Sequence, residues 1–224
     1  MPTTTTTTDP ISADLSTNDA TVLTHLFDPE SASAAASAIT IDPTLPSDPH
    51  ITSPTLLESL RATELRAIRL AEANDLPQAR KILTDLTLSS PDYASGFNNL
   101  AQVLRMLEAS PGEVLAALSR AIELAVPASS SRAGVSARQA NLLAQAYTQR
   151  GALLYMLFKS GGGGDVGVGV DGEQLEMAAS KDFFEGGRYG SEVGREMAVR
   201  TNPYARMCGA IVREALTRDY EGGS

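Results

Sequence analysis

From Thr55 onward, apolar residues recur at helical spacings with few interruptions. The first run keeps one apolar face as far as Asn74 and Asp75, where polar residues break the pattern. A second, shorter run starts near Pro77, which a helix tolerates in its first turn, and ends before Pro91. Two helices of this length joined by a tight turn predict a helical hairpin. The apolar positions of the two runs are Leu56, Leu57, Leu60, Leu65, Ile68, Leu70, Ala79, Ile82, Leu83, Leu86 and Leu88.

The hairpin pattern occurs three times, with small residues where paired helices would approach and larger residues between them. Its period of about 34 residues resembles that of the tetratricopeptide repeat (TPR). The matching positions of the later units are Phe97, Leu100, Ala101, Leu104, Leu118 and Ala121, then Tyr147, Gly151, Leu154, Ala179, Phe183 and Gly186. An unrelated α-bundle with accidental spacing is the alternative. The sequence predicts an all-α solenoid of three TPR hairpins, at about 60–93, 94–127 and 144–191.

Three segments depart from the regular hairpins. Residues 129–143 lengthen the approach to the third repeat, and residues 159–172 read KSGGGGDVGVGVDG. Because each glycine costs a helix about 1 kcal/mol relative to alanine, we expect 159–172 to be a flexible loop. After the repeats, Glu192 to Arg200 has helical spacing, and residues 201–224 are expected to form a C-terminal capping helix. A solenoid needs such helices because its last repeat otherwise exposes an apolar side.

Residues 1–54 differ from the rest and predict an acidic, mostly disordered tail. They hold seven acidic residues and no lysine or arginine, and Asp-Pro recurs four times. Each proline disfavours a helix at the residue before it. One stretch, residues 18–27, begins with a capping asparagine and places four large apolar side chains on one helical face. We expect it to form a short helix that docks on the solenoid, because so short a helix is unstable alone.

Composition excludes several classes of protein. The formal charge is −9, and the chain after residue 54 holds 20 acidic and 18 basic residues, so no basic surface favours nucleic acid. Aromatic residues make up only 5%, which favours packed helices over a β-sandwich. No apolar stretch approaches the length of a membrane span, and no leader pattern occurs at Met1. The single cysteine cannot form an internal disulfide. We therefore expect a cytoplasmic protein that contacts neither nucleic acid nor a membrane.

Candidate catalytic and metal-binding residues are few. Both histidines, His25 and His50, lie in the tail, so a catalytic triad would depend on that segment. Cys208 has no histidine near it in the sequence and no second cysteine with which to hold zinc. Residues 167–172 spell G-x-G-x-x-G, but glycines rather than a strand precede them, which argues against a dinucleotide site. We expect no enzymatic activity, no cofactor and no metal.

The predicted binding surface is the concave face, which the first helix of each TPR hairpin lines. Glu64 and Ile68 are its inward positions in the first repeat, and Thr148 is one in the third. The side chains expected to contact a protein partner are Asn98, Asn99, Gln102, Arg105, Gln145, Gln149 and Tyr155. Amides hydrogen-bond to the backbone of an extended peptide, which makes such a segment the expected ligand. The alternative interpretation is a solvated helix face without a ligand.

Five short segments resemble the tetratricopeptide repeat protein 36 family. They are NDATVLTHLFDPES at 18–31, FNNLA at 97–101, QRG at 149–151, Asp182-Phe183 and NPYARMC at 202–208. The resemblance implies a small cytosolic three-repeat adaptor without enzymatic activity. It also implies binding of an Hsp70-type chaperone and a link to tyrosine breakdown, through protection of 4-hydroxyphenylpyruvate dioxygenase from degradation. We therefore predict an adaptor for a protein partner or, as the alternative, a regulator of tyrosine metabolism.

The manner of chaperone binding is a separate question. TPR domains that hold the C-terminal carboxylates of chaperones resemble one another in five residues, which are lysines, asparagines and an arginine. The corresponding positions here hold Glu64, Ile68, Asn99, Gln145 and Gln149, and of these only Asn99 fits. Carboxylates are bound by charge-assisted hydrogen bonds, and Glu64 would repel them. We expect negligible affinity for a free acidic C-terminal peptide.

Overall fold

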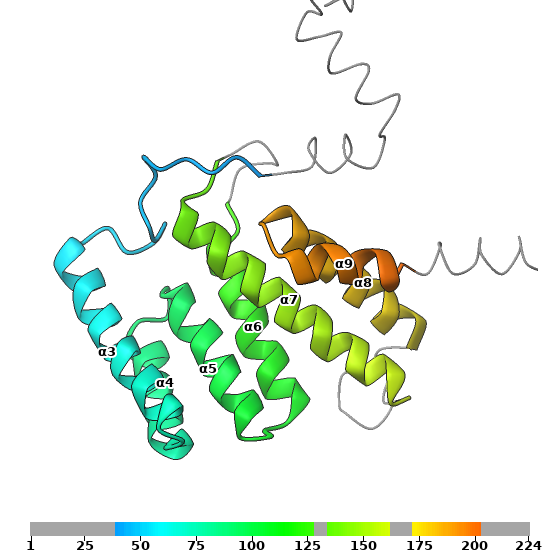
Figure 1. The fold of residues 1–224 in the computed structure, drawn as a ribbon. Coiled ribbons are helices and arrows are strands. Elements are labelled where there is room, and N and C mark those ends of the chain that lie inside the picture. Colours follow the sequence, from blue (N-terminus) through cyan, green and yellow to red (C-terminus); the bar gives the residue numbers. More distant parts are fainter. Residues whose placement is uncertain (1–38, 128–133, 162–171, 203–224) are drawn as a thin grey trace, which may run out of the picture. The chain divides into compact units, whose positions relative to one another are not determined.

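The computed structural model describes residues 39–127, 134–161 and 172–202, which belong to the compact unit that begins at Ile39. These residues contain seven α-helices (Figure 1). In chain order they are α3 (Pro54–Glu72), α4 (Leu76–Ser89), α5 (Ala94–Met106), α6 (Pro111–Ala125), α7 (Ala137–Lys159), α8 (Gly172–Arg188) and α9 (Glu192–Arg200). The described residues contain no strand, only an isolated bridge between Ile41 and Val135. The expected all-α class is confirmed.

Short polar signals in the sequence start most of these helices. The side chains of Ser53, Asp75 and Ser191 accept a hydrogen bond from a backbone N–H in the first turn of α3, α4 and α9. Ser110 and Ser136 form complete capping boxes at the start of α6 and α7. Each cap satisfies a backbone donor that a helix end otherwise leaves without a partner.

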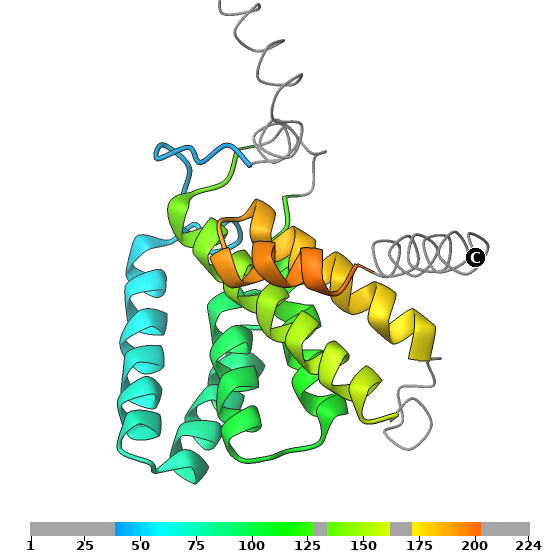
Figure 2. The same ribbon diagram turned by 45° about the vertical axis from the view of Figure 1, so that its right-hand side comes forward.

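The helices are arranged as stacked hairpins. Each helix packs against the next one in the chain, and α5 also contacts α3 and α7 (Figures 1 and 2). The first helices of the hairpins, α3, α5 and α7, thus form one layer, and α4, α6 and α8 form the other. Helix α9 packs against α8 and contacts α7. This is the arrangement of TPR-like helical repeats, as the spacing predicts.

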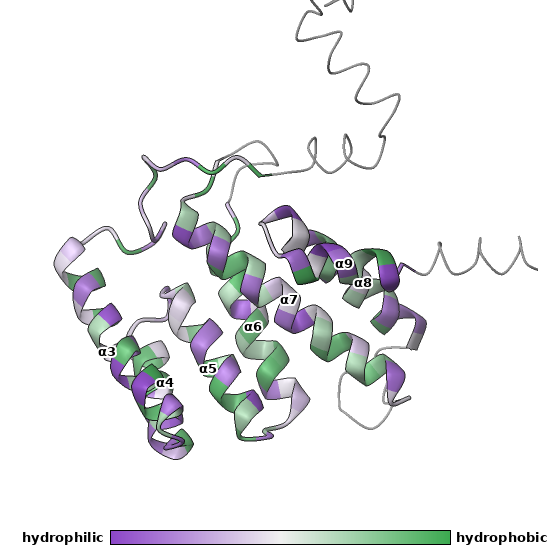
Figure 3. Ribbon diagram, in the orientation of Figure 1, coloured by the Kyte–Doolittle hydropathy of each residue, from purple (hydrophilic) through white to green (hydrophobic). Residues whose placement is uncertain are grey.

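Two apolar clusters hold the stack together. The smaller one joins α3, α4 and α5 and includes the buried Leu83 and Tyr93. The larger one spans α5 to α8 and includes the buried Leu118 and Leu143; Figure 3 shows how hydrophobic α6 is, in the middle of this cluster. Leu100 of α5 packs against both clusters, so the first and second repeats share a continuous core.

Glycine allows two close helix contacts. A Cβ atom on Gly151 of α7 would lie 3.2 Å from the carbonyl oxygen of Ala179 and from the ring of Phe183 in α8. A Cβ atom on Gly194 of α9 would lie 2.9 Å from the carbonyl oxygen of Phe183. Both distances are shorter than ordinary van der Waals contact, so a larger residue would push the helices apart.

Helix α7 begins earlier than the predicted repeat boundary at residue 144. It starts at Ala137, because Ser136 and Gln139 form a capping box there. Residues 137–143, which we expected to approach the third repeat, are therefore the first turns of its helix. Helix α9, by contrast, spans Glu192–Arg200, which are the residues that the apolar pattern indicates.

Residues 39–53, at the end of the expected tail, contact the helical stack. The backbone N–H of Asp42 donates to the carbonyl oxygen of Val135 at 2.9 Å. The Nε2 atom of His50 lies 2.9 Å from the carbonyl oxygen of Leu124 in α6. Asp48 is buried and accepts two backbone N–H groups of its own segment. These residues are held by hydrogen bonds, which a hydropathy pattern does not reveal.

Several predictions concern residues outside the described part of the chain. They are the helix at 18–27 and the disorder of residues 1–38, the glycine-rich segment from 162 to 171, and the capping helix beyond Asn202. Each of them stays a prediction.

Candidate protein-binding face

The seven side chains expected to contact a partner lie on α5 and α7. Together with the inward positions Glu64 and Ile68 of α3, they belong to the layer that we call the α3–α5–α7 face (Figure 1). Gln102, Arg105 and Gln145 are exposed there, while Gln149 and Tyr155 are half-buried. Within the described part of the chain, the side chains of Gln102, Arg105 and Gln149 make no hydrogen bond or ion pair. Their donors and acceptors are therefore free for a ligand, as the adaptor prediction requires.

Two other polar residues of this face connect helices instead. Asn98 is only 4% exposed, and its Nδ2 atom lies 3.5 Å from Oε1 of Gln145 in α7. Its buried Oδ1 atom has no hydrogen-bond partner within the described residues. The Thr148 hydroxyl donates to the carbonyl oxygen of Ala144 at 2.7 Å and lies 2.9 Å from Oγ of Ser191. These side chains link α5 to α7 and α7 to the start of α9.

Glu64 of α3 is buried in a cluster of donors that come from other parts of the chain. Its Oε2 atom accepts from the Tyr93 hydroxyl at 2.6 Å and lies 3.6 Å from NH2 of Arg138 in α7. Its Oε1 atom accepts from the Ser95 hydroxyl and from Nδ2 of Asn99, both in α5. Burial and the neighbouring Glu64 carboxylate raise the pKa of Tyr93, so the phenol stays a donor.

This Glu64 cluster changes the interpretation of Asn99. Its amide nitrogen donates to Glu64 and also lies 3.2 Å from the carbonyl oxygen of Ser95. Both N–H groups of Asn99 are thereby used inside the protein, and none is left for a ligand's carboxylate. The hydropathy pattern does not reveal this, because Tyr93 and Ser95 stand at a helix start where it carries little information.

A hollow of about 300 Å³ opens between α3, α4 and α5, and we call it the Met106 hollow. Its lining residues are Ile68, Ala71, Glu72, Leu83, Asn99, Gln102, Val103 and Met106. Met106 is 46% exposed and contributes part of the apolar lining of the hollow. The hollow therefore combines an apolar interior with polar groups at Glu72 and Gln102. Ile68 and Gln102 could be identified from the repeat pattern. Met106 could not, because it follows Arg105, which occupies the inward position of the helix.

The third repeat carries a separate charged network. Arg150 of α7 makes two hydrogen bonds to Asp182 of α8, at 2.7 and 2.8 Å, and a third to Oγ of Ser119 in α6 at 3.1 Å. Burial disfavours the charge of Arg150, but the hydrogen bonds to Asp182 outweigh it and raise the pKa of Arg150. Its guanidinium lies over the ring of Tyr147, which stacks on Tyr189. This network fixes α7 between α6 and α8.

Two further observations limit the chemistry of the described residues. Their helices include none that is both long and apolar enough to cross a membrane. They also contain no group of three histidine, cysteine or acidic side chains placed to hold a metal ion.

Comparisons with known proteins give the family. No protein-family model matches the chain. The chain is 41% identical to the L-tyrosine degradation gene cluster protein hmgX of Aspergillus fumigatus, over 97% of this chain and 98% of that protein. It is 31% identical to tetratricopeptide repeat protein 36 of Danio rerio, over 91% and 94% of the two chains. It is also 31% identical to tetratricopeptide repeat protein 36 of Homo sapiens, over 71% and 70%. Repeat spacing, helical stack and these relatives agree, and the chain belongs to the tetratricopeptide repeat protein 36 family.

Proposed function

We propose that the chain is a non-enzymatic adaptor that binds a protein partner on the α3–α5–α7 face and acts in tyrosine degradation. The observation that supports binding is the Met106 hollow, an apolar space with the free side chain of Gln102 at its edge. The observation that supports the metabolic role is the name of the Aspergillus fumigatus relative, which is similar over nearly the whole chain.

The face suits a peptide segment of a partner protein. A hollow of about 300 Å³ has room for one apolar side chain of the partner. Gln102 and Gln149 can hydrogen-bond to the backbone of the same segment, since an amide both donates and accepts. Arg105 adds a positive charge that no acidic group of the described residues neutralises. Binding therefore relies on a buried apolar side chain with polar contacts around it.

A second proposal names the partner. The resemblance to the family implies that the protein protects 4-hydroxyphenylpyruvate dioxygenase from degradation, and the tyrosine-related name of the 41% identical relative favours this role. An Hsp70-type chaperone is the other partner that the resemblance implies. Asn99 is engaged with Glu64, so a chaperone would bind by contacts other than a carboxylate clamp.

The test compares two methionines of nearly equal exposure. Met106→Glu places a charge at the Met106 hollow, whereas Met177→Glu places one on α8, outside the lining of the hollow. Met106 is 46% exposed and Met177 is 47% exposed, so both variants are expected to fold equally well. Each variant is expressed in cells that lack the gene. Its partners are then identified by crosslinking and mass spectrometry, and the levels of the dioxygenase and of tyrosine-derived metabolites are measured.

We expect Met106→Glu to lose the partner and to resemble the deletion, and Met177→Glu to resemble the unaltered protein. Equal partner recovery with both variants would contradict the proposed binding site. Unchanged dioxygenase and metabolite levels in cells that lack the gene would contradict the role in tyrosine degradation, whatever partner is found.

A further inference from the structure

The buried carboxylate of Glu64 has an unusual set of partners. Its side chain is 5% exposed, and both oxygens are engaged, by three hydrogen-bond donors and one guanidinium. The donors are Tyr93, Ser95, Asn99 and Arg138, and none of them lies on α3, which carries Glu64. The donors thus come from α5, from Tyr93 just before it, and from α7. Helix α3 supplies only the acceptor.

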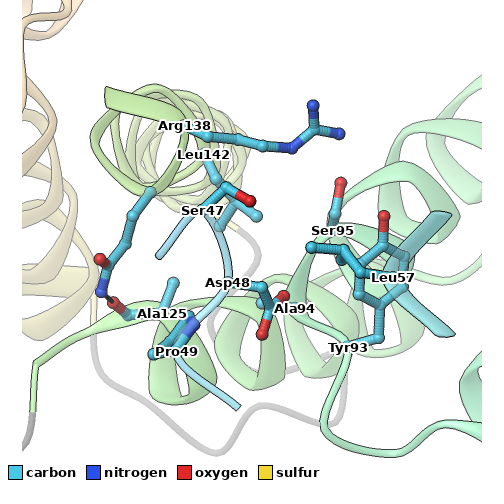
Figure 4. Close-up of a pocket in the computed structure, with 11 residues that line it drawn as sticks. Ser47, Asp48, Pro49, Leu57, Tyr93, Ala94, Ser95, Ala125, Arg138 and Leu142 are labelled. Atoms are coloured by element: carbon cyan, nitrogen blue, oxygen red, sulfur yellow. Dashed lines mark hydrogen bonds between the residues drawn. The ribbon is translucent and has the colours of Figure 1, made fainter. Parts of the chain in front are cut away.

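The donors converge on one place. Figure 4 shows the hydroxyl groups of Tyr93 and Ser95 and the side chain of Arg138 around a small cavity, with both hydroxyls directed to the side on which the guanidinium lies. Neutral hydroxyl and amide donors with one arginine are the groups that bind carboxylates in proteins. The site is also near solvent, because the side chain of Arg138 is 49% exposed.

We propose that these four side chains form a carboxylate-binding site that the protein fills with its own Glu64. Glu64 acts as an internal ligand, and it excludes the free carboxylate of a partner from this part of the α3–α5–α7 face. The site itself does not depend on the proposed function, whereas the exclusion of partners rests on binding at that face. Partners that end in a free acidic terminus are therefore poor ligands, and internal segments are favoured.

Glu64→Ala tests the site directly. The substitution removes a methylene and a carboxylate, which correspond to the atoms of acetate, and leaves the four donors in place. We expect the variant to melt at a lower temperature than the unaltered protein. Sodium acetate should raise its Tm by several degrees in a saturable manner, whereas sodium chloride of equal ionic strength should not, since a ligand stabilises the folded state that binds it.

Two controls separate binding from a general salt effect. Glu58→Ala removes an exposed glutamate from the same helix, outside the lining of the Met106 hollow, and both it and the unaltered protein should respond equally to acetate and chloride. An equal acetate response in all three proteins would overturn the proposal, and so would the absence of an acetate-specific response in Glu64→Ala. If that variant folds only in part, refolding yields in acetate and in chloride are compared, and equal yields overturn the site.

A peptide tests the exclusion of partners. A short peptide with an acidic, free C-terminus is titrated calorimetrically into the unaltered protein and into Glu64→Ala. We expect at least tenfold tighter binding to Glu64→Ala, and amidation of the peptide's C-terminus should remove the gain. Acetate rescue without any gain for the peptide would contradict the exclusion of partners.

Discussion

Removal of the Asp182 carboxylate is the sharpest test of what holds the third repeat together. Arg150 and Asp182 form a two-bond ion pair at 2.7 and 2.8 Å, and their side chains are 23% and 6% exposed. Asp182→Ala leaves the guanidinium without its carboxylate. Loss of one partner of a buried pair costs about 3–5 kcal/mol, because the remaining charge is poorly solvated. Since Arg150 keeps some exposure, we expect a loss of about 3 kcal/mol in the free energy of unfolding.

The assay is urea unfolding followed by circular dichroism, with thermal unfolding beside it. A domain of this size loses about 2–4 °C in Tm per kcal/mol, so Asp182→Ala should lower Tm by roughly 6–12 °C. The double variant Arg150→Met, Asp182→Leu should recover most of the stability, since an apolar pair leaves no charge unpaired. Glu196→Ala is the matched control. It breaks the exposed pair with Arg200, whose side chains are each 68% exposed, and should cost less than about 1 kcal/mol.

Two results would refute this reasoning. A loss below about 1 kcal/mol for Asp182→Ala would show that the pair behaves as a surface ion pair. A double variant as unstable as the single one would show that Asp182 acts through its shape or its other contacts, and not through its charge.

Three further predictions concern single positions. Gly151→Ala should lower Tm because its Cβ atom would crowd α8, whereas Gly112→Ala, which meets nothing within 4 Å, should leave Tm unchanged or slightly raised. Ser110→Ala removes the cap of α6 and should cost about 0.5–2 kcal/mol in urea unfolding, and an unchanged midpoint would contradict this. Burial, with the nearby Glu185 carboxylate, raises the pKa of Tyr147 to about 12, so this phenol should stay protonated in the folded state at pH values where an unfolded tyrosine ionises. Stability should therefore fall as the pH rises from about 10 towards 12, and Tyr147→Phe should reduce that fall and remove one late step from an absorbance titration.

The positions of the helices follow from local features of the sequence. Apolar spacing and the caps at Ser53 and Ser110 act within one or two turns, so the start of α3 and the whole of α9 could be predicted closely. The start of α7 was predicted less well. The capping box at Ser136 precedes the repeat landmarks, and alignment to a repeat gives no weight to residues before them.

The candidate site was only partly predictable. Helical position places Gln102 and Arg105 on the α3–α5–α7 face, and the structure leaves both side chains exposed. The same position places Asn99 there as well, but its amide is engaged with Glu64. Whether the amide of Asn99 or that of Gln102 is free depends on the Glu64 carboxylate of another helix. A local sequence pattern does not contain that information.

The sequence by itself determined the helical class and the set of polar residues along the first helix of each repeat, because both depend on neighbours three or four positions away. It also determined the repeat spacing, because the same helical pattern recurs after about 34 residues. Only the tertiary structure decided which of those side chains stay exposed and which are buried in contacts within the protein. Glu64 meets Tyr93, Ser95, Asn99 and Arg138, and Ile68 meets Met106 around a hollow, only after three helices have packed. Burial pairs some polar groups with each other, since a buried polar group without a hydrogen bond is costly, and the others stay exposed to solvent.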